Sequence, residues 1–166
     1  EMPEVWKKTY KVMETSYFLS RKLTGKFQTN ENTGFAYTLI QKAGWSKGWF
    51  NKGLVNSLGL DINRFPEIAE VGANLGKPTK EVIEYLGITE NVSVFSGMQD
   101  TTACSLGGGA FNDYDAVIEI GTTLNTAITI GTRTFDILKG LYSVSSPIPN
   151  KFVLVGEPGA GAKVLN

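Results

Sequence analysis

The stretch VSVFSGMQDTTACSLGGGAF, residues 92–111, indicates a short strand that leads directly into a helix. Apolar and polar residues alternate over 91–96, which is typical of a half-buried strand. Gly97 to Asp100 forms a tight exit, and a helix with one face of small residues follows and ends in the glycines 107–109. In α/β sheets, ligands bind where strands end, so this junction is the first place to expect a functional site.

The residues after this stretch predict strands. Residues 116–120 (AVIEI) and 124–130 are joined by the turn Gly121-Thr122-Thr123, and together they predict a hairpin. Residues 152–155 predict a further strand, and the glycine-rich segment 156–161 predicts a turn into a helix.

The residues before this stretch predict mainly helices. Apolar residues recur at spacings of three and four over 3–24, which predicts one helix with a proline in its first turn and a glycine after its end. A short element is predicted around 35–40 and a helix at 48–58. Thr79 and Gly87 are suited to cap and to end a further helix.

This change from helices to strands predicts a domain boundary. Helices dominate residues 1–90 and strands dominate residues 91–166, and the glycines between them favour domains at 1–108 and 109–166. The chain also opens within a helix pattern and stops in a glycine-rich turn, so we expect it to be a segment of a longer protein.

The composition argues against several classes of function. Lys plus Arg and Asp plus Glu are both 16, so we expect neither nucleic acid nor a membrane as a partner. Histidine is absent, so catalysis must rest on other groups, and no metal-ligating residue is predicted. The single Cys104, expected to be buried and inert, suits a reducing compartment, and no apolar run approaches the ~20 residues of a membrane helix. We therefore expect a soluble, cytoplasmic protein.

Two of the candidate sites lie at turns. Asp100 is either a functional carboxylate or a helix cap that binds the backbone of Thr102 or Ala103. The Gly121-Thr122-Thr123 turn either binds phosphate oxygens through amide hydrogens and hydroxyls or is an ordinary hairpin turn.

The third candidate is the glycine-rich segment 156–163. It nearly matches a P-loop, but Lys163 comes one place late and Val164 replaces the hydroxyl that would hold magnesium, which excludes a Walker-type NTPase. Its glycines can still present amides to a nucleotide, or they form a structural turn.

Taken together and in their order along the chain, these strands, turns and helices resemble the central part of the FGGY family of carbohydrate kinases, the group of glycerol, xylulose and gluconate kinases. Residues 92–111 are similar to the family segment that carries the catalytic aspartate. Residues 116–128 (AVIEIGTTLNTAI) are similar to the first strands of the family's second domain, with its Gly-Thr phosphate turn. Residues 3–34 and 65–82 agree with the family as well, so the resemblance covers essentially the whole chain.

The resemblance implies an α/β chain of the actin-like (ribonuclease H-like) ATPase fold, spanning the end of the first, sugar-binding domain and the start of the second, nucleotide-binding domain. It implies transfer of the ATP γ-phosphoryl group to a hydroxyl of a small-molecule sugar or polyol, with a pentulose favoured and with ATP and Mg²⁺ as cofactors. By the same resemblance Asp100 would be the catalytic base. The implied substrate-binding residues are Thr101 and Gln99, and the implied nucleotide-binding residues are Gly121, Thr122, Thr123 and Gly161.

The chain also departs from the family pattern. The family's first phosphate loop, its adenine site and its signature motif are absent, so we expect the chain alone to be inactive, with apolar sheet edges that a second copy could cover in a homodimer. Asn30 stands where many members carry an aspartate, which leaves the role of this position open. The alternatives are an acetate-kinase-like or hexokinase-like enzyme, and a non-catalytic actin-fold module that binds a nucleotide or a partner.

Overall fold

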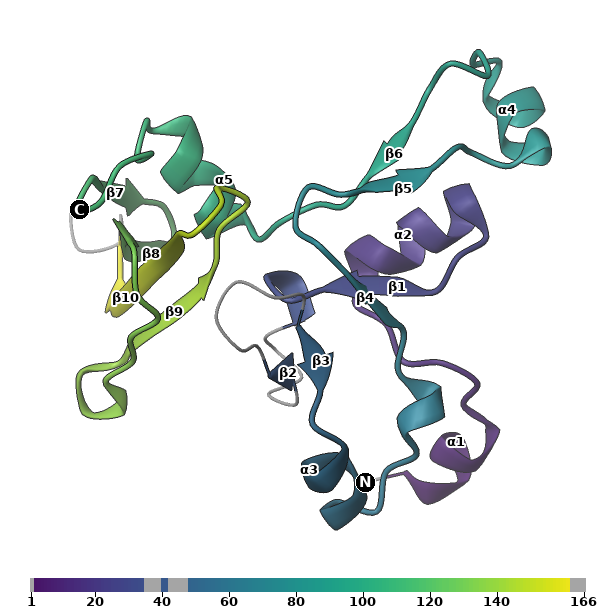
Figure 1. The fold of residues 1–166 in the computed structure, drawn as a ribbon, viewed down its shortest axis with the longest axis horizontal. Helices are drawn as coiled ribbons and strands as arrows, with labels where there is room; N and C mark the ends of the chain where they lie inside the picture. Colours follow the sequence, from purple (N-terminus) through teal and green to yellow (C-terminus); the bar gives the residue numbers. More distant parts are fainter. Residues whose placement is uncertain (1, 35–39, 42–47, 162–166) are drawn as a thin grey trace. The chain divides into compact units, whose positions relative to one another are not determined.

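Two compact units make up the computed structural model, which describes residues 2–34, 40–41 and 48–161 (Figure 1). The first unit is Glu1–Gly97 and the second is Met98–Asn166. The short element predicted around 35–40 and the helix predicted after 161 fall largely outside the described residues. The domain boundary predicted between residues 108 and 109 stays a prediction.

Among its described residues, the first unit combines short helices with three two-stranded pairings. Strand β1 pairs with β4 in parallel, while β2 pairs with β3 and β5 with β6 in antiparallel fashion. In chain order, its elements are α1 (Pro3–Lys8), α2 (Thr15–Thr24), β1 (Gln28–Asn30), β2 (Ile40–Gln41), β3 (Trp49–Phe50), α3 (Lys52–Ser57), η2 (Ile62–Arg64), β4 (Glu67–Ala69), β5 (Asn74–Gly76), α4 (Lys80–Leu86) and β6 (Val94–Phe95).

In the described part of this unit, the core consists of two small apolar clusters. One gathers Tyr17, Ala69 and Leu75, and the other gathers Val55 and Phe65. The first cluster joins α2 to residues more than 50 positions further along the chain, and the second joins α3 to the residue after η2, so burial of apolar surface holds these short elements in place.

The predicted single helix over 3–24 is wrong, because α1 and α2 are separated by an extended segment. The residues between α1 and α2 form hydrogen bonds with the chain around η2 instead of helical hydrogen bonds with one another. The backbone N–H of Val12 donates to the carbonyl of Arg64 (2.9 Å), and the Lys11 ammonium donates to the carbonyls of Asn63 (2.5 Å) and Phe65 (3.1 Å). These distant partners replace the backbone bonds that a continuous helix would make.

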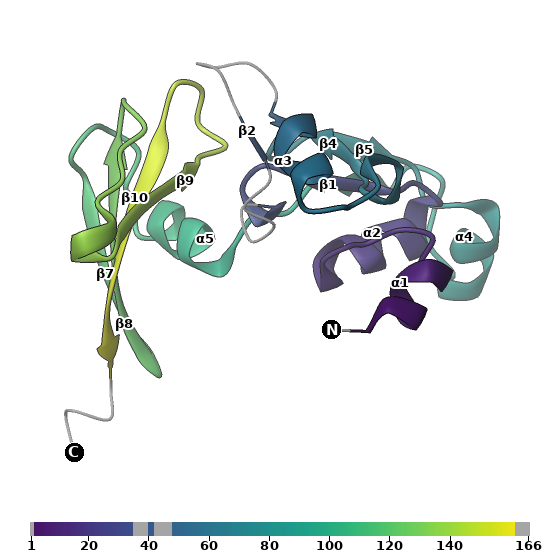
Figure 2. The same ribbon diagram turned by 90° about the horizontal axis from the view of Figure 1, so that it is seen from below.

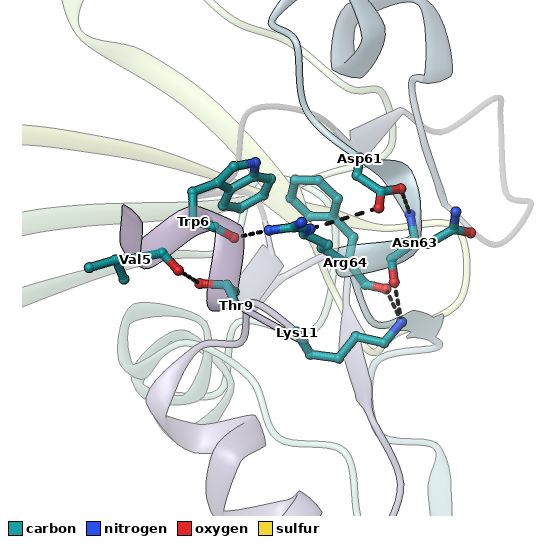
Figure 3. A network of polar contacts seen from close by, with 8 residues as sticks. Val5, Trp6, Thr9, Lys11, Asp61, Asn63 and Arg64 are labelled. Atoms are coloured by element: carbon teal, nitrogen blue, oxygen red, sulfur yellow. Dashed lines mark hydrogen bonds and ion pairs between the residues drawn. The ribbon is translucent and has the colours of Figure 1, made fainter. Parts of the chain in front are cut away.

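Arg64, the last residue of η2, also contacts α1 (Figure 3). Its guanidinium donates to the carbonyl oxygen of Trp6 and lies 4.7 Å from the centre of the Trp6 ring. Its Nε lies 3.7 Å from a carboxylate oxygen of Asp61. Arg64 thus combines a hydrogen bond, a cation–π contact and an ion pair at one point.

The helix predicted between Thr79 and Gly87 is confirmed as α4. The Thr79 hydroxyl accepts a hydrogen bond from the backbone N–H of Val82 (3.4 Å), and Gly87 has the left-handed backbone, φ 63°, that ends a helix. The helix predicted at 48–58 is shorter than expected, because α3 begins only after its cap, Asn51.

The second unit is an antiparallel sheet packed against a helix. The sheet order is β7-β8-β10-β9, and α5 packs against β7, β8 and β10 (Figures 1 and 2). Its elements are α5 (Asp100–Gly107), β7 (Ala116–Ile120), β8 (Thr123–Ile130), η3 (Ile137–Lys139), β9 (Leu141–Ser145) and β10 (Phe152–Ala160). The buried side chains of its core are those of Ala127, Val144, Val153 and Val155.

The predicted hairpin is confirmed by the pairing of Ile120 with Leu124 across β7 and β8. The predicted turn over 156–161 is wrong, because β10 continues to Ala160 and pairs there with Thr123. The glycines allow this continuation: the register shifts between Gly156 and Gly159, and Gly159 has φ 111°. None of the helices in the described ranges is long and apolar enough to cross a bilayer.

Asp115 closes the loop between α5 and β7. Its Oδ2 accepts hydrogen bonds from the backbone N–H groups of Asn112 (2.8 Å) and Phe111 (3.1 Å). The bond from the Asn112 backbone is the main cause that lowers the pKa of the Asp115 carboxyl below its usual value. These bonds favour the charged form in the folded state.

Because the folded pKa of Asp115 is lowered, its contribution to stability is present above the unfolded value of about 4 and is lost as the pH falls through the folded pKa. We expect Asp115→Asn to lower the Tm of the protein at pH 7, and to lower it less as the pH approaches 3. Calorimetry of both proteins across this range measures the difference. A Tm difference that stays constant from pH 7 to pH 3 would contradict the role of the charge.

Candidate functional site

Asp100 is the first residue of α5, and it is exposed. Its Oδ1 accepts a hydrogen bond from the backbone N–H of Thr101 (2.7 Å) and lies 3.5 Å from the Thr101 hydroxyl. Asp100 is not the N-cap that the sequence allowed, because Gln99 holds that position with extended backbone, φ −63° and ψ 150°. A negative charge in the first turn still favours the helix, since a helix N-terminus carries partial positive charge.

The second carboxylate oxygen of Asp100 is available to accept a proton or a hydrogen bond. Within the part of the chain that the structure describes, the bonds of this carboxylate run to Oδ1 alone. Thr102 and Ser105 form the buried side of α5, while Gln99 and Thr101 are half-buried beside Asp100. Asp100 thus stands at the open end of a helix whose other side is packed.

Cys104 differs from the prediction. It was expected to be buried, but its side chain is exposed on α5. The pKa of its thiol is raised, with partial desolvation as the largest cause, followed by the negative charges of Glu119 and Asp100. A raised thiol pKa disfavours the reactive thiolate.

The turn between β7 and β8 holds three of the predicted phosphate-binding residues. The backbone N–H of Gly121 donates to the carbonyl of Thr123 (3.0 Å), which closes the turn. Thr122 and Thr123 are exposed. Because the Gly121 amide is already bonded, an anion at this turn would be bound by the threonine hydroxyls and the remaining backbone N–H of Thr122 rather than by Gly121.

Gly161, which lies 40 positions further along the chain, packs against the same turn. Its backbone N–H donates to the carbonyl of Thr122 (3.1 Å). A Cβ atom added at Gly161 would lie 2.5 Å from the carbonyl oxygen of Gly121 and 2.5 Å from that of Thr123. Only a glycine fits this close approach, so the structure brings all four predicted nucleotide-binding residues together.

No hydrogen bond joins Asp100 to these four residues within the described ranges. They belong to the same unit and are connected through the packing of α5 against β7 and β8. The structure therefore assembles the nucleotide-binding candidates at one turn and presents Asp100 separately, at the start of α5.

One residue that the sequence did not single out, Tyr142, lies within electrostatic reach of Asp100. Burial is the main cause that raises the pKa of Tyr142, and the negative charges of Glu157 and Asp100 raise it further. Tyr142 lies on β9 opposite Val155 of β10. No local signal could have pointed to it, because β9 was not predicted and only the pairing of these two strands brings Tyr142 close.

Comparison with known families gives a match over most of the chain. The model of the N-terminal domain of the FGGY family of carbohydrate kinases matches residues 1–107.

Individual proteins agree with this match. The chain is 31% identical over 166 residues to a xylulose kinase of Lactococcus lactis subsp. lactis (strain IL1403), which covers 99% of this chain and 32% of that protein. It is 25% identical over 154 residues to a xylulose kinase of Staphylococcus xylosus, over 91% of this chain and 31% of that protein. The chain thus spans about a third of the length of these relatives.

A solved structure has the same fold. The crystal structure of a ligand-bound xylulose kinase from Lactobacillus acidophilus superimposes with a TM-score of 0.87 at 17% identity, over 100% of this chain and 33% of that chain. This likeness confirms the predicted fold class, an α/β part of the actin-like (ribonuclease H-like) ATPase fold.

Proposed function

Because this chain belongs to the FGGY family of carbohydrate kinases, we propose that the full-length protein transfers the γ-phosphoryl group of ATP to a hydroxyl of a sugar or polyol. A pentulose is the favoured substrate, because both curated relatives named above are xylulose kinases. The 166 residues span only about a third of those relatives, so we propose that the chain alone is inactive. We further propose a cytoplasmic location and leave a homodimer as a prediction.

The observation that carries this proposal is the exposed carboxylate of Asp100. It stands at the first residue of α5, and its Oδ2 accepts no bond from the described residues. A carboxylate can orient the attacking hydroxyl and accept its proton. The transition state of phosphoryl transfer is loose, so the base mainly orients the hydroxyl and takes its proton late. Gln99 and Thr101 flank Asp100 in sequence and are proposed to bind the sugar.

The turn with Gly121, Thr122 and Thr123, together with Gly161, is proposed to bind the phosphates of ATP. The exposed hydroxyls of Thr122 and Thr123 suit phosphate oxygens, Gly121 forms the tight turn that carries them, and Gly161 lets the chain after β10 pack closely against this turn.

Magnesium is proposed to enter as the ion bound to ATP, held largely by phosphate oxygens and waters. Among the described residues, there is no group of three or more Cys, Asp or Glu side chains that could hold a metal ion. The described part of the chain therefore offers no metal cage of its own, and no step of the reaction is derived through the ion.

The experiment that tests this function is an ADP-release assay on the full-length protein with ATP, Mg²⁺ and a panel of D-xylulose, other pentuloses, glycerol and gluconate. We expect the highest kcat/KM with a pentulose. If glycerol or gluconate is the best substrate instead, the proposed kinase activity stands but the proposed preference for a pentulose is contradicted. ATP binding without ADP release on any of these compounds would favour the alternative, a non-catalytic actin-fold module.

A further inference from the structure

A group of buried polar residues lies at the end of β1 in the first unit. Thr29, Asn30 and Asn32 are all fully buried. Burial of polar side chains is costly unless they are hydrogen-bonded, so this group must be held by specific partners. Asn30 is at its centre.

Both the oxygen and the nitrogen of the Asn30 side-chain amide form hydrogen bonds. Its Oδ1 accepts from the backbone N–H groups of Asn32 (2.9 Å) and Thr33 (2.9 Å). Its Nδ2 donates to the hydroxyl of Ser96 (2.6 Å) and to the backbone carbonyl of Gly97 (2.7 Å). An amide has two donor hydrogens, and both are used on the segment that follows β6.

Ser96 is held from two further directions. Its backbone N–H donates to the carbonyl of Ala73 (2.8 Å), and its hydroxyl lies 2.7 Å from that of the buried Tyr17. Hydrogen bonds therefore hold the backbone in place at Ser96 and at Gly97, which is the last residue of the first unit. Only Met98 and Gln99 separate this point from Asp100.

The residue type at position 30 matters for this anchor. An aspartate has the same shape as asparagine but carries no N–H, so it would place an oxygen against the carbonyl oxygen of Gly97. Two acceptors at 2.7 Å repel each other, and removing one partner leaves the other unsatisfied in a buried place. The Gly97 carbonyl therefore favours asparagine over the aspartate that many family members are expected to carry here.

We propose that Asn30 is a positioning residue that fixes the start of the catalytic segment by holding the carbonyl of Gly97, three residues before Asp100. The proposal rests on the catalytic role proposed for Asp100. The orientation of a catalytic carboxylate depends on the backbone that carries it, and small displacements of a catalytic group have large effects on rate.

The test compares Asn30→Asp with Tyr17→Phe in the full-length protein. Tyr17→Phe removes the hydroxyl that contacts Ser96 but leaves the Asn30–Gly97 bond in place, so it is the matched control for loss of stability. We measure kcat, KM for both substrates, Tm, and hydrogen exchange of the backbone over 98–101. If Asn30→Asp does not fold, Asn30→Ser replaces it, because serine is too short to reach Gly97.

We expect Asn30→Asp to lower kcat about ten-fold. KM for ATP should stay unchanged, and exchange over 98–101 should become faster. Tyr17→Phe should lower Tm but keep kcat within about two-fold. The proposal is overturned if kcat of Asn30→Asp falls no further than that of Tyr17→Phe, or if exchange over 98–101 is unchanged. If the catalytic role of Asp100 is wrong, Asp100→Asn keeps its turnover. Hydrogen exchange over 98–101 in Asn30→Asp still tests separately whether Asn30 holds the backbone at Gly97.

Discussion

Asp100→Asn in the full-length protein is expected to lower kcat for sugar phosphorylation by about 10²–10⁴-fold, with ATP binding retained. Asparagine keeps the Oδ1 acceptor that bonds the Thr101 N–H, so the start of α5 is preserved. It cannot take a proton from the sugar hydroxyl, however, because an amide is not a base at neutral pH. The loss should therefore fall on kcat and leave the nucleotide site intact.

Steady-state kinetics and calorimetric titration of ATP measure the two effects separately. Asp113→Asn is the matched control, because Asp113 is an exposed carboxylate of the same unit that pairs with Lys151 (2.7 Å) and has no proposed role in the reaction. Its kcat should equal that of the unaltered protein. Full turnover by Asp100→Asn would show that Asp100 only shapes the helix start.

Gly161→Ala is expected to destabilise the protein by about 1–3 kcal/mol, the usual cost of overfilling a packed site. The added methyl group would lie 2.5 Å from two backbone carbonyl oxygens of the Gly121–Thr123 turn, and backbone atoms cannot rotate away as a side chain can. Relief requires the turn and the end of β10 to move apart. Since this turn is the proposed phosphate site, affinity for ATP should fall together with Tm.

Gly107→Ala provides the contrast. Gly107 is the last residue of α5, and a Cβ atom there would meet nothing within 4 Å. Alanine favours a helix over glycine by about 0.5–1 kcal/mol, so this variant should be neutral or slightly more stable. Denaturant unfolding and ATP titration of both variants test the pair. Equal effects of the two substitutions would contradict the close approach at Gly161.

Local signals predicted those elements whose bonds are made between near neighbours. The Thr79 hydroxyl bonds three residues ahead, and Gly87 ends α4 by its own backbone conformation. Alternating residues and a glycine turn were likewise enough to predict the β7–β8 hairpin, because its strands are joined directly. The position of Asp100 at the start of α5 follows from the same short-range pattern, although its proposed role came from the family resemblance.

Predictions failed where a distant segment supplies the bonds. The helix over 3–24 is interrupted because Val12 and Lys11 bond to the chain around η2, more than 50 residues away. The glycines after 155 form strand instead of a turn because β8 offers them a pairing edge.

The sequence alone therefore accounts for the helix that begins at Asp100, the hairpin with its threonine turn and the family of the chain, because each rests on short-range patterns. Tertiary structure alone places Gly161 against the carbonyl of Gly121, brings Tyr142 near Asp100 and turns the amide of Asn30 onto Gly97. The residues of each pair lie 40 or more positions apart in the sequence, and neighbouring residues carry no signal of burial or backbone pairing across such separations.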